Sequence, residues 1–106
     1  MKERDWKKFK VIKQRAIEQF CTQALDEFGE IISNSDEHVH NRYLRLYKLV
    51  RERDKEMSLV FDDHSRSKAP MQLTAIRARG LADESLLAEL SDEFREQTDP
   101  KPFGWT

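Results

Sequence analysis

Three histidines and the carboxylates beside them are the residues with the most evident capacity for chemistry, as ligands of a metal ion. His38 and His40 follow two acidic residues, and His64 follows two more. Side chains two positions apart on a helix point about 200° apart, so His38 and His40 cannot share a metal ion there. His64 lies roughly 39 Å along the predicted hairpin from His38. We expect no metal and no cofactor within one chain, which leaves open a site shared by two antiparallel chains.

Nucleophilic chemistry has equally little support in the sequence. Cys21, the single cysteine, is expected to be half-buried, and no basic residue lies directly beside it to activate the thiol. The stretch Asp62 to Ser67 contains Ser, His and Asp, but a catalytic triad is assembled by a fold and not by neighbours in sequence. Three widely spaced glycines cannot form a phosphate-binding loop. We predict a non-catalytic protein with no catalytic residues.

Nucleic-acid binding is the alternative function that we weigh. Residues 72–91 have the apolar spacing of a helix-turn-helix with Gly80 at the turn, but the helix that would read DNA is acidic and phosphates would repel it. Basic residues are more frequent on the two preceding helices. The candidates for contacts with a nucleic-acid backbone are Lys7, Lys8, Lys10, Arg42, Arg45 and Lys48. Around residues 7–15 the basic side chains surround the helix, whereas a phosphate-tracking surface would keep to one face.

Composition favours a small helical domain. Charged residues make up 37% of the 106 positions, and glycine and proline occur three times each, which argues against a turn-rich β-fold. No apolar run approaches the length of a membrane span, and the charged N-terminal stretch does not resemble a signal peptide, so we expect a cytoplasmic protein. Residues 1–15 carry an excess of basic groups and residues 83–99 an excess of acidic ones. These two stretches should meet, within one chain or between two.

The apolar periodicity predicts an all-α fold. Apolar residues at steps of three and four run from Trp6 to Ile31 and again from Val39 to Phe61, which indicates two long helices. A tight turn near residues 34 and 35 would fold them into an antiparallel hairpin. Two shorter helices, over residues 68–79 and from Asp83 to just before Pro100, should pack on this hairpin. We expect residues 1–100 to be one helical domain and 101–106 to be a non-helical tail.

The turn position sets which residues should face each other across the hairpin. It pairs Phe20 with Val50 and Phe9 with Phe61, and it places Asp54 opposite Lys13 where the apolar stripe is interrupted. A charge in a helical seam persists most readily beside its opposite. We therefore predict a structural ion pair between Lys13 and Asp54.

Surplus apolar residues on the outer faces of the long helices suggest a protein partner. Two short helices cannot cover all of them, and uncovered apolar helix faces are typical of helical oligomers. The candidate partner-binding residues are Leu25, Ile32, Leu44, Leu49 and Leu59, with Phe103 and Trp105 of the tail. The two tail aromatics should fold back over the domain or else contact a partner. The predicted function is protein–protein interaction, as a homodimer and with an unidentified protein, and not at a membrane.

Overall fold

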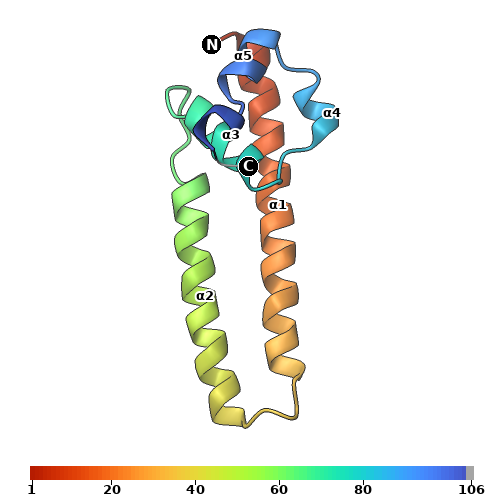
Figure 1. Cartoon of the computed structure of the whole chain (residues 1–106), viewed down its shortest axis with the longest axis vertical. Coiled ribbons are helices and arrows are strands. Elements are labelled where there is room, and N and C mark those ends of the chain that lie inside the picture. Colours follow the sequence, from red (N-terminus) through yellow and green to blue (C-terminus); the bar gives the residue numbers. More distant parts are fainter. Residues whose placement is uncertain (105–106) are drawn as a thin grey trace.

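The computed structural model describes residues 1–104, and over this range the chain is all-α with no strand, as predicted. Two long helices, α1 (Glu3–Ser33) and α2 (Val39–Phe61), run antiparallel (Figure 1). Three short helices, α3 (Ala69–Ala78), α4 (Glu84–Leu87) and α5 (Asp92–Gln97), gather around the N-terminal half of α1 (Figure 1). The molecule is elongated, with extents of 53 × 25 × 21 Å.

The connection between α1 and α2 is longer than the sequence suggested. It spans residues 34–38, and α2 begins only at Val39, after the N-cap His38, whose Nδ1 accepts a hydrogen bond from the His40 amide. Asn34 Oδ1 accepts from the Asp36 amide and shapes the turn. α2 therefore extends past the end of α1 at this tip (Figure 1). Arg42 closes the connection, since its guanidinium donates to the carbonyls of Ile32 and Glu37.

This extension shifts the register of the hairpin. Arg53 faces Glu27, with nitrogen–oxygen distances of 2.8 and 3.1 Å, and the Phe61 ring meets Phe20 with centroids 5.9 Å apart. The predicted pairing of Phe20 with Val50 is therefore wrong. Each residue of α1 faces a residue of α2 that lies about ten positions later in the sequence than a turn near residues 34 and 35 predicts. The end of α2 consequently reaches only as far as Phe20.

The predicted ion pair between Lys13 and Asp54 is wrong for the same reason. Lys13 lies beyond the end of α2, where its Nζ donates to the Asp63 carbonyl at 2.7 Å and to Gln72 Oε1 at 3.3 Å. Only 6% of Lys13 is exposed, whereas Asp54 is exposed on α2. Burial lowers the pKa of the Lys13 ammonium, against the opposing effect of the nearby carboxylates of Asp63 and Asp62. Lys13 therefore ties α1 to the loop before α3.

The hydrophobic core lies at one end of the molecule. We call this end the head and define it as residues 3–20 and 58–103. We call residues 21–57 the stem. Phe9 and Ile12 of α1 and Leu73 and Ile76 of α3 are fully buried in the head. Leu81 and the apolar residues of α4 and α5 complete this core. The stem is a layer of only two helices.

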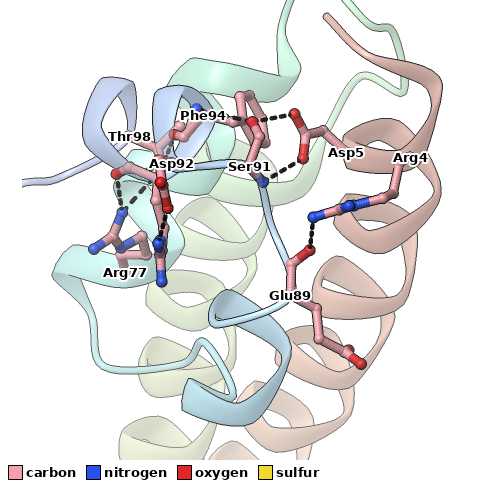
Figure 2. Close-up of polar contacts among 9 residues, drawn as sticks. Arg4, Asp5, Arg77, Glu89, Ser91, Asp92, Phe94 and Thr98 are labelled. Atoms are coloured by element: carbon pink, nitrogen blue, oxygen red, sulfur yellow. Dashed lines mark hydrogen bonds and ion pairs between the residues drawn. The ribbon is translucent and has the colours of Figure 1, made fainter.

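The last predicted helix is broken into two. The structure has α4 and α5 in place of one helix, because Ser91 between them caps α5 by accepting from the Phe94 amide at 3.2 Å. The Asp5 carboxylate accepts from the Ser91 amide at 2.8 Å and from its hydroxyl at 2.6 Å, as Figure 2 shows. Asp5 is only 2% exposed, so this contact is an internal tie between the two ends of the chain.

The basic and acidic stretches meet within one chain. Lys8 pairs with Glu89 at 3.0 Å and Arg15 with Asp83 at 2.9 Å, while Arg4 donates to the Glu89 carbonyl. These contacts place α4 and the segment after it along the outer side of α1. Of the two arrangements that the charges allowed, the structure has the intramolecular one.

The tail departs from the expected non-helical form. Lys101–Phe103 forms one turn of 3-10 helix, η1, which ends at Gly104 in the left-handed conformation with φ of 68°. Phe103 keeps 59% of its surface exposed, so the expected burial of its ring is not what the structure has. Trp105, the other aromatic of the tail, lies outside the described residues.

We predict that Asp5→Ala lowers the free energy of unfolding by about 1–3 kcal/mol, because it leaves the partly buried Ser91 amide without its acceptor. Asp26→Ala is the matched control, since Asp26 is exposed on the same helix. Urea titrations of the two variants measure the difference. Equal midpoints would show that Asp5 does not hold the two ends together.

The tie made by Lys13 is tested by a double-mutant cycle with Gln72. Gln72→Leu should cost about 1–3 kcal/mol where Lys13 is present, since a buried ammonium loses an acceptor. In the Lys13→Met background the same change should cost less, by at least about 0.5 kcal/mol. Asp54→Ala should stay within about 0.5 kcal/mol of the parent, as expected for an exposed residue. Additive effects of the two head variants would contradict the contact.

Candidate protein-interaction face of the stem

One side of the stem carries an apolar groove between α1 and α2. Its lining comprises Phe20, Cys21, Ala24, Leu25 and Phe28 from α1, and Val50, Arg53, Asp54 and Met57 from α2. Leu25 is 65% exposed and Val50 42% exposed although both line it. Arg53 turns its guanidinium to Glu27, which leaves Asp54 as the one unpaired charge among the lining residues.

Helical periodicity places further exposed apolar residues on the same side of each helix, between the groove and the tip. Residues three, four and seven positions apart share one side of a helix. On this rule Ile32 continues the row of Leu25 and Phe28 on α1. Tyr43 and Tyr47 continue the row of Val50 on α2, and they are 67% and 56% exposed. We call the resulting surface the stem face and define it by Cys21, Leu25, Phe28, Ile32, Val39, Tyr43, Tyr47, Val50, Asp54 and Met57.

The opposite side of the stem is polar. Glu27, Arg53 and Glu56 lie there, and Arg79 at the end of α3 reaches Glu56 at 3.4 Å. The hydrogen bond from Arg53 lowers the pKa of the Glu27 carboxyl below its ordinary value of 4.5. Leu81 lines the same hollow, so the segment after α3 covers part of this side. The two sides of the stem therefore differ sharply in polarity.

The leucines and isoleucine that the sequence nominated for partner binding do not form one surface. Leu25 and Ile32 belong to the stem face. Leu49 is half-buried beside Ile31 on the opposite side. Leu44 is 49% exposed and Leu59 82% exposed, but helical periodicity places both on the side of α2 that points away from α1.

Phe28, Tyr43, Tyr47 and Val50 are the interaction candidates that sequence reasoning missed. All four were assigned to the stripe that packs between the two helices. The stripe is wider than one neighbouring helix can cover, and these residues lie on its uncovered flank. Comparing the number of apolar residues in each stripe with the number that one neighbouring helix can cover would have identified them.

The six basic candidates for nucleic-acid contact form two separate groups. Lys7, Lys8 and Lys10 lie on the head, whereas Arg42, Arg45 and Lys48 lie near the tip. Along α1 the groups are about 35 Å apart. Three of the six already have partners within the chain. Lys8 pairs with Glu89, Arg45 pairs with Glu37, and Arg42 donates hydrogen bonds to main-chain carbonyls.

No group of three or more His, Cys, Asp or Glu side chains within residues 1–104 could hold a metal ion. Cys21 is half-buried at the head end of the groove, as predicted. Among these residues no helix has the length and apolar character needed to cross a membrane.

Comparison of the chain with models of known protein families, with curated proteins and with solved structures finds no match. The interaction face therefore has to be interpreted from its own geometry.

The polar side of the stem gives a pH-dependent prediction. The lowered pKa of Glu27 means that its pairing with Arg53 stabilises the fold above a pH of about 4.5 and that this contribution is lost as the pH falls through the lowered pKa. Glu27→Gln should therefore destabilise the protein near neutral pH, by under about 1 kcal/mol for so exposed a pair. Unfolding titrations at neutral and acidic pH should show the difference from the parent vanishing in acid. A difference that is constant with pH would contradict the assignment.

Proposed function

We propose that this chain is a non-catalytic interaction protein that forms a homodimer through its stem face. The observation that carries the proposal is the apolar strip along one side of a two-helix layer, beside a polar opposite side. Exposed apolar strips of this kind on a small protein are characteristic of interaction sites. Pairing two such layers face to face would give a four-helix bundle, in which the apolar rows of both stem faces are covered.

The energetics favour a partner that covers the whole face. Burying one large apolar side chain contributes about 1.5–3 kcal/mol relative to leaving it exposed. In a twofold dimer each residue counts twice, once on each protomer. Several such side chains are needed to offset the roughly 4–15 kcal/mol cost of association. The face also carries Tyr43 and Tyr47, and tyrosine is among the residues that most often dominate binding energy.

The composition of the face favours a second copy over nucleic acid. Its charged member, Asp54, would repel phosphates. The basic residues near it are divided between head and tip, and half of them already have partners in the chain. The single cysteine, without a second one for an intrachain disulfide, supports the cytoplasm as the setting for this dimer.

Leu25→Glu should prevent dimer formation, because it places a charge in the middle of the apolar face. Leu59→Glu is the matched control: it makes the same change at a more exposed leucine outside the face. Light scattering across a range of concentrations measures the mass. We expect twice the chain mass of 12.6 kDa for the parent and for Leu59→Glu, and a single chain for Leu25→Glu.

A single-chain mass for the parent at all concentrations up to about 100 μM, two orders above a micromolar dissociation constant, would overturn the proposal. So would loss of the dimer in Leu59→Glu with retention in Leu25→Glu. A complex that nuclease removes and that weakens steeply with salt would instead favour the nucleic-acid alternative.

A further inference from the structure

We infer that the stem faces associate with uptake of a proton by Asp54, so that the dimer is tighter in mildly acidic solution than at neutral pH. This inference rests on the proposed dimer and names the residue that regulates it. It comes from a single carboxylate among the apolar residues of the groove.

Asp54 lies within the apolar row of α2 and not at the end of that row. Val50 lies four positions before it and Met57 three positions after it, so the three share one side of the helix. All three line the groove, and Leu25 and Phe28 line it from α1. A second stem that covers these apolar residues therefore also covers the Asp54 side chain. This holds for either direction in which the second stem can run.

Asp54 has no hydrogen bond or ion pair within residues 1–104. Arg53, its neighbour in sequence, pairs with Glu27 at 2.8 Å on the polar side of the stem. Arg51 lies one turn before Asp54, and its guanidinium carbon is 5.7 Å from the centre of the Tyr47 ring. The two arginines of α2 nearest to Asp54 thus contact other groups.

α1 brings no positive charge to the groove. Cys21 is its one titratable residue in the lining, and a thiol carries no positive charge in either protonation state. Glu18, three positions before Cys21 on the same side of the helix, is a further carboxylate. The stem face itself has no basic member. A second copy therefore covers Asp54 with apolar side chains and with its own Asp54.

An ionised carboxylate is costly to bury without a partner, and a group in that position takes up a proton instead. Asp5 shows the alternative within this chain. It is 2% exposed and accepts from the Ser91 amide at 2.8 Å and from the Ser91 hydroxyl at 2.6 Å. Asp54 has no such donors, so covering the groove favours its neutral form.

Proton uptake couples association to pH. An aspartate in water is ionised at neutral pH, so two free chains bind fewer protons there than the dimer in which Asp54 is neutral. Because the dimer binds more protons, lowering the pH shifts the equilibrium towards it. Two copies contribute one carboxyl each, which doubles the effect.

The dissociation constant of the full chain can be measured by sedimentation equilibrium at about pH 7.5 and about pH 5.5. We expect it to be about tenfold lower at the acidic value, or lower still, since a change of one unit at a single carboxyl is already tenfold. Both values lie above 4.5, the ordinary pKa of the Glu27 carboxyl, so the pairing of Glu27 with Arg53 is retained.

Asp54→Asn removes the charge and keeps the shape of the side chain. At about pH 7.5 this variant should dimerise about tenfold more tightly than the parent, and its dissociation constant should change by less than about threefold between the two pH values. Asp26→Asn is the matched control. Asp26 is exposed and follows Leu25 directly, so it points about 100° away from that residue of the stem face. This control should behave as the parent does.

The same variant separates Asp54 from the histidines, which also titrate in this pH range. His38 and His40 lie at the start of α2, and His64 lies against the Trp6 ring on the head, with centroids 5.2 Å apart. All three are present in Asp54→Asn. A pH dependence that persists undiminished in this variant would show that Asp54 is not its source, and the inference would be wrong.

Two further outcomes at neutral pH contradict the inference and leave the proposed dimer standing. If Asp54→Asn dimerises more weakly than the parent, the carboxylate meets a basic group of the other copy. If it dimerises equally well, the carboxylate stays in water at the edge of the interface. A single-chain mass for the parent and for Asp54→Asn at both pH values, at concentrations up to about 100 μM, would overturn the dimer and this inference together.

Discussion

The offset between the two long helices is the constraint on which the rest of the structure depends. A five-residue connection lets α2 begin beyond the end of α1, so α2 ends level with Phe20 and leaves the N-terminal part of α1 without a helical neighbour. The chain after Phe61 has to supply that neighbour, and α3, α4 and α5 do so. The same offset leaves the other end of the hairpin as two helices whose apolar side is covered by no residue within 1–104. Head and stem are thus two consequences of one displacement.

Buried polar contacts fix how the short helices sit on α1. Each short helix is too short to be stable alone, so its position depends on tertiary contacts. Lys13 holds the loop between α2 and α3 through a main-chain carbonyl, and Asp5 holds the start of α5 through Ser91. Arg77 of α3 donates to the Thr98 hydroxyl and to the Arg95 carbonyl, which joins α3 to the end of α5 (Figure 2). These contacts give the small core a single arrangement at the cost of burying an ammonium and a carboxylate.

Local sequence signals predicted the elements well and their relative placement poorly. The two long apolar stripes, the turn at Gly80 and the third helix are where periodicity and turn residues put them. The predicted register was wrong because the register depends on the length of the 34–38 connection. This connection ends at His38, which caps α2, and not at an earlier residue. The break at Ser91 was missed because its cause, Asp5, lies 86 residues away. Some residues of the stem face were wrongly predicted to pack between α1 and α2. Which residues pack between the two helices depends on the register, so this error follows from the wrong register.

The uneven distribution of the core implies that different parts of the chain open independently. Amide hydrogens in the stem are protected only by the helices themselves and by one apolar seam, so they should exchange through local fraying that starts at the tip. Phe9, Ile12 and Leu73 in the head are fully buried, so their amides should exchange only when the whole fold is lost. The residue at which exchange changes from local to global opening should lie close to Phe20, where α2 ends. Hydrogen exchange along α1 alone would therefore trace the boundary between head and stem.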